Sequence, residues 1–406
     1  MLFHGDNMTS LHRNNRSAVL WALQHTDGTS RKRLAETLSL TPAAITHITS
    51  ELLSEHLLRE GELMDSTGAG RREKKLEINP KSGCALGILL NVKKAVLSAT
   101  YLDGSTVFTE EVVLDPQMSA DDLVLWLSSA LQTEAFSHGI MPEDVVGLGL
   151  AVRGIPTQDG RGIANSFGVF KERDYPICDR FAKQIKVPTI LDNNVRALSL
   201  AERFLSRGQE EAEFFLRCEY GIGASLTING QIWHGISEQG GEIGHIPVVP
   251  RGGKLCSCGK CGCLETIASP TAIREDALAV CQPDTTPVLW KMVQSKGENA
   301  ITVEDVFQAA RSGDTGTADV IGRAIKALAQ ALKAVIYLVD PGKITLYGRM
   351  FDDSFVMSRL LSEMSEGVDE DHRVRVVKSA FNRRLENRCA CLLAVKHFFD
   401  EGGLRR

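Results

Sequence analysis

Apolar residues recur at helical spacing three times within the first part of the chain. They predict helices over residues 14–24, from Ser30 onward and from Thr41 onward. Serine and threonine at these two positions are N-cap types, and proline follows Thr41 at the first helical position. Two stretches between residues 57 and 78, separated by glycine and serine, predict a β-hairpin. This succession of elements is typical of a winged helix-turn-helix, which we place at residues 11–80.

Beyond residue 80 the hydrophobic pattern changes to short apolar runs, separated by turns and by longer helical stretches. Strands are expected at residues 83–90, 95–101, 107–113, 145–152, 187–191, 213–217, 224–228, 231–234 and 343–347. Helices are expected at residues 120–135, 194–205, 320–339 and 387–399. Alternating strands and helices of this kind indicate an α/β protein.

Composition places the chain among ordinary globular proteins. Of its 406 residues, 43% are hydrophobic and 24% are charged, which excludes wholesale disorder and predicts two or three domains. No apolar run reaches about 18 residues and the N-terminus lacks a signal-peptide pattern, so we expect a cytoplasmic protein without membrane insertion. The formal net charge of −5 removes the argument that a globally basic chain binds nucleic acid, so any contact with DNA must be local.

The predicted winged helix-turn-helix is neutral overall, but its basic residues are clustered. Ten basic side chains balance ten acidic ones in residues 1–80. The expected contacts to phosphates or to the minor groove are Arg31, Lys32, Arg33, Arg71 and Arg72. The expected readers of base edges, at the start of the third helix, are Thr41, Ala43, Ala44, Thr46 and His47. The pattern favours binding of a double-stranded DNA operator, and a three-helix dimerisation or adaptor module is the alternative.

Four of the ten cysteines lie in the segment 256–263, and His245 precedes them. In a reducing compartment such a cluster is more often a metal site than a disulfide framework. Three thiolates and one imidazole form a closed tetrahedral site of the kind that holds structural zinc. Gly259 and Gly262 allow the backbone to curl so that nearby sulfurs face one ion. The spacing alone leaves open which cysteine is not a ligand, and Cys261 is a fifth candidate.

Two motifs resemble the signature of the ROK family of repressors, open reading frames and sugar kinases. They are Gly-Glu-Ile-Gly-His at 241–245 and Cys-Ser-Cys-Gly-Lys-Cys-Gly-Cys-Leu-Glu at 256–265. The resemblance implies that the zinc ligands are His245, Cys256, Cys258 and Cys263. Repressors of this family, unlike its kinases, carry an N-terminal winged helix-turn-helix, which residues 11–80 predict independently.

The resemblance also implies a fold. The family has a two-lobed, actin-like (ribonuclease H-like) sugar-kinase ATPase fold. On this chain the first lobe would span residues 81–194 and the second lobe, with the zinc site, residues 195–385. A helix at about 387–400 would pack back toward the N-terminal half.

Several positions that a kinase of this family needs are altered. The resemblance places the catalytic base in a Glu-Asn-Asp-like triplet, which is Asp192-Asn193-Asn194 here. The base position then holds Asn194, an amide that does not accept a proton usefully near neutral pH, although a one-residue shift of the alignment would move Asp192 toward that role. The first phosphate turn, at 90–94, lacks the family's aspartate and glycines, whereas the second, at 221–225, keeps its glycines. We therefore expect a protein that is not an enzyme, and an active ATP-dependent sugar kinase is the alternative.

The sugar-binding positions of the family are better kept. They correspond to Gly154, Asn165, Asn193, Asn194, Glu242, His245 and Glu265. The resemblance implies that His245 binds zinc through one nitrogen and a sugar through the other. For Glu242 and Glu265 the alternative is a surface or loop-bracing carboxylate. Arg153 and Arg196 depart from the family pattern, which leaves a phosphorylated or acidic sugar open, and Arg196 is expected on the surface of its helix.

Together these features predict a sugar-responsive transcriptional repressor of carbohydrate metabolism genes. A sugar or sugar-phosphate effector would bind in the cleft between the lobes and change the separation of the DNA-reading heads of a homodimer or tetramer. The alternative inducer is a protein partner, such as a sugar transporter.

Overall fold

The structure is a computed structural model, and it forms two compact units. They are Met1–Gln209 with Arg383–Arg406, and Glu210–Asn382. The residues that the structure describes are 8–26, 28–64, 73–249, 251–367, 374–381 and 384–405. Arg71 and Arg72, two of the expected DNA contacts, lie outside the described residues. Within those described ranges, no helix combines the length and the apolar character that crossing a membrane requires.

The N-terminal part of the first unit is a winged helix-turn-helix. Its elements are α1 (Met8–Thr26), α2 (Arg31–Leu38), α3 (Pro42–Ser54) and the antiparallel strands β1 (Leu58–Met64) and β2 (Glu73–Ile78). Both predicted N-caps are present, because Ser30 accepts a hydrogen bond from the Arg33 amide and Thr41 accepts one from the Ala44 amide. The apolar faces that predicted these elements meet in a buried core. It includes Leu34, Ile45, Leu52 and Leu76.

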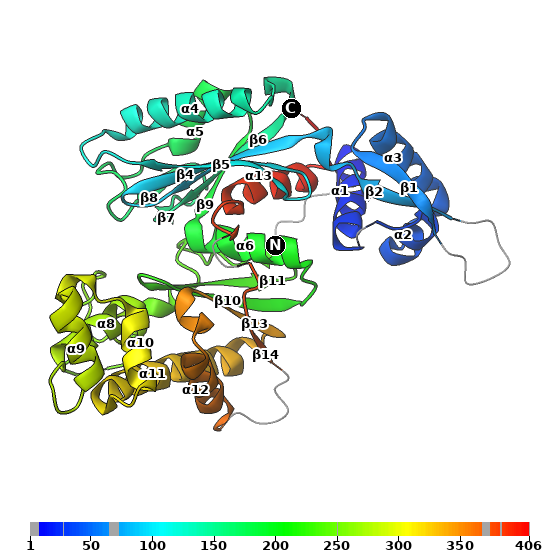
Figure 1. Cartoon of the computed structure of the whole chain (residues 1–406). Helices are drawn as coiled ribbons and strands as arrows, with labels where there is room; N and C mark the ends of the chain where they lie inside the picture. Colours follow the sequence, from blue (N-terminus) through cyan, green and yellow to red (C-terminus); the bar gives the residue numbers. More distant parts are fainter. Residues whose placement is uncertain are drawn as a thin grey trace. The chain divides into compact units, whose positions relative to one another are not determined.

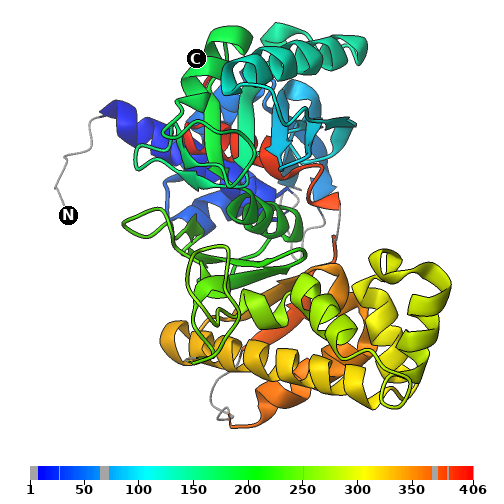
Figure 2. The same ribbon diagram turned by 90° about the vertical axis from the view of Figure 1, so that its left-hand side faces the viewer.

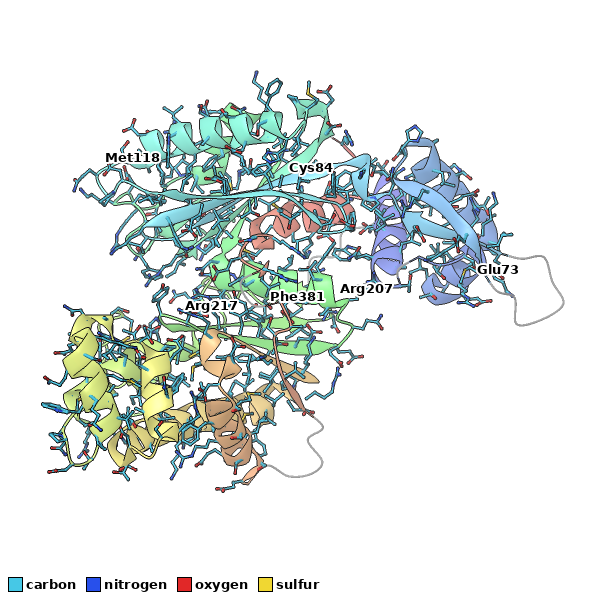
Figure 3. The ribbon with its side chains drawn as sticks, in the orientation of Figure 1. Glu73, Cys84, Met118, Arg207, Arg217 and Phe381 are labelled. Carbon is cyan, nitrogen blue, oxygen red and sulfur yellow. The ribbon has the colours of Figure 1, made fainter. Side chains whose placement is uncertain are left out.

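A five-stranded sheet forms the body of the first unit (Figure 1). Its strands are β3 (Cys84–Leu90), β4 (Lys94–Tyr101), β5 (Thr106–Val113), β6 (Val145–Val152) and β9 (Thr189–Asn193). The order across the sheet is β5-β4-β3-β6-β9, with an antiparallel β5-β4-β3 meander and with β6 and β9 parallel to β3. One face packs against α4 (Ala120–Ser137) and α5 (Ile177–Ile185) in a single core. Glu73 at the start of β2 and Cys84 at the start of β3 are labelled in Figure 3.

The other face of this sheet is covered by the C-terminal helix α13 (Cys389–Asp400) (Figure 1). Two strand glycines let the helix backbone come close. A Cβ at Gly87 would lie 2.6 Å from the amide nitrogen of Cys391, and a Cβ at Gly149 would lie 1.7 Å from the carbonyl oxygen of Ala390. Side chains at these two positions are therefore excluded by the helix that the sheet must bind.

The winged helix-turn-helix, from α1 to β2, is called the head below. Its helix α1 also contacts α13. The indole nitrogen of Trp21 donates to Asp400 at 2.9 Å, and its ring meets Phe399 edge-on. Arg16, which is only 2% exposed, donates from Nε to the carbonyl oxygen of Gly402 at 2.8 Å. Polar and aromatic contacts thus join the DNA-binding fold to the end of the chain within the first unit.

The second unit repeats the topology of the first sheet. Its strands are β10 (Ala212–Cys218), β11 (Ile222–Ile228), β12 (Gln231–Ile232), β13 (Lys343–Tyr347) and β14 (Arg375–Lys378), in the order β12-β11-β10-β13-β14. Again an antiparallel meander is followed by two strands parallel to its first member. Its longest helix is α11 (Thr315–Val339), which contacts α8 (Pro270–Ala279), α10 (Val303–Arg311) and α12 (Ser354–Ser365) (Figure 2).

Two five-stranded sheets follow the winged helix-turn-helix in the chain, and they confirm the predicted α/β class. The expected strand at 343–347 is β13 in full, whereas the one expected at 187–191 begins two residues later. The sequence prediction lacks several elements, namely β7 (Ile155–Pro156), β8 (Ile163–Asn165), α5, α8, α9 (Pro287–Lys296), α10, α12 and β14. Helix α6 (Asn194–Ser206), which we expected in the second lobe, lies in the first unit.

Candidate functional site

His245 and three cysteines of the second unit form a compact group of metal-ligand atoms. The Nδ1 atom of His245 lies 3.5 Å from the Sγ atom of Cys256. The Sγ atoms of Cys258 and Cys263 lie 3.6 Å apart. One ligand atom from each of the four residues falls within 4.8 Å of all the others. The structure therefore brings together the four residues that the family resemblance implied.

The spacing of these atoms suits one tetrahedral ion. Bonds of about 2.3 Å to sulfur and about 2.0–2.1 Å to nitrogen place the ligand atoms of a regular tetrahedron roughly 3.4–3.8 Å apart. Cys261 is exposed and is not part of the group. Gly259 and Gly262 have φ angles of 86° and 73°, and a Cβ at Gly262 would lie 2.1 Å from the carbonyl oxygen of Val249. The donor chemistry and the loop geometry both fit zinc.

The thiols of Cys258 and Cys263 differ in acidity. Burial, and then the neighbouring sulfurs of Cys258 and Cys256, raise the pKa of Cys263 to about 12. The pKa of Cys258 is instead lowered, chiefly by a hydrogen bond from the backbone amide of Lys260. A divalent cation supplies the charge that allows all three sulfurs to be thiolates.

The second ring nitrogen of His245 faces a carboxylate. Its Nε2 atom lies 3.7 Å from Oε2 of Glu242, whose side chain is 39% exposed. A carboxylate at this nitrogen orients a metal-bound imidazole and raises its basicity. The metal-ligand group and one expected sugar ligand are therefore neighbours.

Glu265 braces the glycine-rich turn between β10 and β11. It begins the short helix α7 (Glu265–Ala268), and its Oε2 atom accepts a hydrogen bond of 2.8 Å from the Ile222 amide. A Cβ at Gly221 would lie 2.2 Å from the same oxygen, so a side chain there would displace the Glu265 carboxylate. This contact matches the loop-bracing alternative for Glu265. Because the Ile222 amide already donates to this carboxylate, it is not free to bind a phosphate.

A hollow of about 170 Å³ lies beside this turn in the second unit. Its lining includes Glu219, Tyr220, Arg274, Glu304 and Arg349. The guanidinium of Arg349 is shared between two carboxylates, with Nε 3.9 Å from Glu219 and Nη1 3.6 Å from Glu304. The hollow is smaller than the roughly 300–1,000 Å³ of typical small-molecule sites. The guanidinium of Arg274 donates to the backbone carbonyls of Ile301 and Glu298, so both arginines of the lining already have partners.

The first unit groups four of the expected sugar residues at the ends of β6 and β9. The Oδ1 atom of Asn193 caps α6 by accepting from the Val195 amide, and its Nδ2 atom donates to the carbonyl oxygen of Gly154, both at 2.8 Å. Gly154 packs on the next hairpin, since a Cβ there would lie 2.4 Å from the carbonyl oxygen of Asn165. Asn194, the first residue of α6, is buried.

Asp192 and Arg196 form a buried ion pair at the start of α6. The Nε atom of Arg196 lies 2.6 Å from Oδ1 of Asp192, and that oxygen also accepts a bond of 2.7 Å from the Asn193 amide. The two side chains are 9% and 3% exposed. The expected surface position of Arg196 is therefore wrong, because Arg196 and most other residues of α6 are buried. The spacing i, i+4 of opposite charges is a signal for the pair, but not for its burial.

The start of α3 exposes most of the residues expected to read DNA. The exposed positions are Thr41, Ala43, Thr46 and His47, and Ala44 is half-buried. The hydroxyl of Thr41 caps the helix, and the hydroxyl of Thr46 donates to the Pro42 carbonyl at 2.7 Å. The imidazole of His47 is more accessible than these two hydroxyl groups, because the His47 side chain is 69% exposed.

The basic residues of α2 differ in their surroundings. Arg31 donates from Nε to the Thr49 hydroxyl at 3.1 Å and lies 3.4 Å from Glu60, so it ties α2 to α3 and to β1. Lys32 and Arg33 are exposed. These two side chains are better placed than Arg31 to meet an outside phosphate.

Two contacts in the head lie outside the sequence prediction. Arg16 of α1 donates to Glu55 of α3 at 2.8 Å, from 39 positions away in the chain. His12 of α1 faces Glu51 of α3, also from 39 positions away in the chain. No spacing rule predicts such contacts, because they depend on how α1 packs against α3.

Comparisons with known proteins agree with these arrangements. Residues 86–392 match the model of the ROK family. The DNA-binding transcriptional dual regulator NagC of Escherichia coli (strain K12) is 28% identical over 345 residues, which are 84% of this chain and 82% of NagC. A glucokinase of Halalkalibacterium halodurans is 30% identical over 258 residues, which are 63% of this chain and 76% of that enzyme.

A solved structure of a ROK family transcriptional regulator, a homologue of the E. coli Mlc protein, covers 97% of both chains. Its TM-score is 0.79 at 22% sequence identity, so this likeness concerns the fold. The family match extends over most of the chain. The chain belongs to the ROK family.

Proposed function

We propose that this chain is a sugar-responsive, DNA-binding transcriptional repressor of carbohydrate metabolism genes. One combination carries the proposal: a winged helix-turn-helix precedes a ROK region in which the expected position of the kinase base holds Asn194. NagC, a relative over most of the chain, is named a DNA-binding transcriptional regulator.

The head would bind operator DNA with the start of α3 in the major groove. The readers of base edges would be Thr41, Ala43, Ala44, Thr46 and His47, and the contacts to phosphates or the minor groove Arg31, Lys32, Arg33, Arg71 and Arg72. The internal contacts of Arg31 make Lys32 and Arg33 the stronger phosphate ligands of α2. A homodimer, alone or within a tetramer, would place two α3 helices in successive major grooves, about 34–36 Å apart.

Three features argue against kinase activity. Asn194 is not ionisable, and Asp192 is held by the buried guanidinium of Arg196 instead of facing a hydroxyl group. Glu265 binds an amide of the turn that would have to receive phosphate. The glucokinase relative and the retained Gly221–Ser225 segment favour kinase activity as the second candidate.

The effector would be a sugar or a sugar phosphate. The polar groups for it are Gly154, Asn165, Asn193 and Asn194 in the first unit and Glu242, His245 and Glu265 in the second. Structural zinc, held by His245, Cys256, Cys258 and Cys263, would orient the His245 imidazole and with it the neighbouring Glu242. Because Glu265 accepts a hydrogen bond from the Ile222 amide, it would hold the turn in place as well as bind the effector.

The decisive experiment selects sequences from random DNA with the purified full chain and then measures their affinity by fluorescence anisotropy at several salt concentrations. We expect one preferred pseudo-palindromic sequence. His47→Ala should weaken binding to it and relax the preference, whereas Lys32→Ala should weaken all sequences equally and reduce the salt dependence. Lys183→Ala, an exposed charge change on α5, is the matched control and should change neither.

Binding without sequence preference would overturn the proposal. A panel of sugars and sugar phosphates is then screened for release of the selected DNA. If none of these sugars releases the DNA, but a protein partner such as a sugar transporter does, the inducer is a protein and not a sugar. Sugar-dependent ADP release that Asp192→Asn abolishes would establish the kinase instead.

A further inference from the structure

The DNA-binding head holds a second group of metal-ligand atoms, formed by His12 of α1 with His47 and Glu51 of α3. The Nε2 atom of His12 lies 2.9 Å from Oε2 of Glu51, and the Nε2 atom of His47 lies 3.3 Å from Oε1 of the same carboxylate. One ligand atom from each residue lies within 4.8 Å of the other two. Two imidazoles from different helices therefore converge on one carboxylate.

We propose that these three residues bind a divalent transition-metal ion of the zinc type, and that the bound ion withdraws His47 from DNA. Two neutral imidazoles and a carboxylate are ligands that suit zinc and its borderline neighbours. His47 and Glu51 are spaced i, i+4 on one face of α3, a spacing that lets one helix supply two ligands to one ion. His12 supplies the third ligand from α1, and water completes the coordination.

The charges around the group favour a cation. Arg16 lies 3.5 Å from Oε2 of Glu51, but the same guanidinium is bound by Glu55 at 2.8 Å. Arg16 and Glu55 neutralise one another, so the carboxylate of Glu51 keeps its negative charge beside the two imidazoles. Because Arg16 also touches Oε2, Oε1 is the oxygen better placed to bind an ion.

The ligands are accessible to an ion from solution. The side chains of His12, His47 and Glu51 are 42%, 69% and 32% exposed, and the two imidazole centroids lie 6.1 Å apart at an interplanar angle of 55°. This exposure distinguishes the site from the cysteine site of the second unit, two of whose cysteines are fully or almost fully buried. The head site should therefore exchange its ion far more readily than the cysteine site.

The consequence for DNA rests on the proposed function, whereas metal binding itself does not. His47 is one of the expected readers of base edges, and coordination would tie its imidazole to α1. The added positive charge would at the same time strengthen non-specific attraction to phosphates. The quantity that should fall is therefore the ratio of specific to non-specific affinity, by about tenfold for the loss of one base contact.

The metal experiment uses the full chain after mild chelation, and Zn²⁺ and Co²⁺ as probes. We expect the wild type to bind one more ion per chain than His12→Gln. The extra Co²⁺ should show d–d absorption without the thiolate charge-transfer band that a cysteine site produces. His56→Asn, which removes another exposed histidine of the head, is the matched control and should bind as many ions as the wild type.

The DNA experiment measures the affinity ratio of the same proteins with and without saturating Zn²⁺. His12 is not among the expected DNA readers, so His12→Gln should keep the wild-type ratio without metal and lose the tenfold fall when metal is added. Equal ion counts in wild type and His12→Gln would overturn the site. An extra ion that leaves the ratio unchanged would overturn the regulation but not the site. If the full chain lacks sequence preference, the proposed function fails while the ion count still decides the site.

Discussion

The two sheets of the molecule have the same strand order but different first turns. In the first unit β3 and β4 are joined by Asn91–Lys93, and the Asn91 amide donates to the Lys94 carbonyl at 2.9 Å. In the second unit β10 and β11 are joined by Glu219–Gly221, and the Glu219 amide donates to the Gly221 carbonyl at 3.1 Å. Both turns have three residues, yet only the second contains glycine.

The comparison shows that topology and chemistry are separable in this fold. The turn of the first unit carries Lys93 in place of a glycine cradle, and Lys94, the first residue of β4, pairs with Glu111. The turn of the second unit keeps its glycine, but the Glu265 carboxylate binds one of its amides. The two turns thus differ in composition and in contacts, while the strands of both sheets keep the same order.

Loss of a metal ligand should have the largest effect on stability. It should destabilise the second unit and leave the stability of the first unit unchanged. Cys258→Ser is expected to remove the metal and to destabilise the second unit by about 5 kcal/mol or more, because metal-binding free energy is partly folding free energy. Calorimetry should show a lower melting transition for the second unit and an unchanged one for the first. Cys261→Ser is the control, since this exposed sulfur lies outside the ligand group. Undiminished zinc content in Cys258→Ser would contradict the assignment.

Breaking the buried ion pair should affect only the first unit. Arg196→Met leaves the Asp192 carboxylate buried without its cation and should cost about 3–5 kcal/mol in the free energy of unfolding. The double variant Asp192→Asn with Arg196→Met should recover most of that loss. Arg180→Met removes an exposed partner of Asp121 and should cost under about 1 kcal/mol. Equal losses from both arginine variants, measured by urea unfolding, would show that burial does not set the cost.

A methyl group added between the first sheet and α13 should cause the next largest loss in the free energy of unfolding. Gly149→Ala places its Cβ against the Ala390 carbonyl and should cost about 1–3 kcal/mol by forcing α13 away from β6. Gly322→Ala lies in α11 of the second unit, where only Arg359 approaches, at 4.0 Å. This control should instead stabilise by about 0.5–1 kcal/mol, through helix propensity. Thermal unfolding of both variants tests the opposite signs.

The smallest expected effect concerns the turn of the second unit. Glu265→Ala frees the Ile222 amide and removes a negative charge, so the affinity for pyrophosphate should rise by about tenfold, from a very weak value. Glu275→Ala makes the same charge change at an exposed position of α8 and serves as the control. Calorimetric titration with pyrophosphate measures both variants. An unchanged affinity in Glu265→Ala would mean that this contact does not close the turn to phosphate.

Local signals predicted much of the fold. Caps at Ser30 and Thr41 marked two helix starts, and the apolar run at 343–347 marked β13, because each depends on neighbouring residues only. The prediction lacks the short strand β14 and helices α8 and α9, whose positions depend on packing within the second unit. It also lacks α10, although its apolar residues recur at helical spacing and Thr302 and Asp305 form a capping box at its start.

Prediction of the candidate site followed the same division. The ligand group of the second unit was predicted because a dense local motif supplies three of its members. Sequence reasoning gave Arg196 a surface position, since helix spacing cannot show that most of α6 is buried. The contacts of His12 and Arg16 with α3 were not predicted at all, because they join residues nearly 40 positions apart.

The position of α13 in the chain affects how the protein is made on the ribosome. The helix that covers one face of the first sheet is synthesised only after every strand of the second sheet. Until then, that face and the glycines Gly87 and Gly149 are uncovered in the nascent chain, an exposure that favours binding by chaperones. The second unit, whose strands and helices are contiguous in the chain, is free to fold first. Translation would thus complete the second unit before it completes the first.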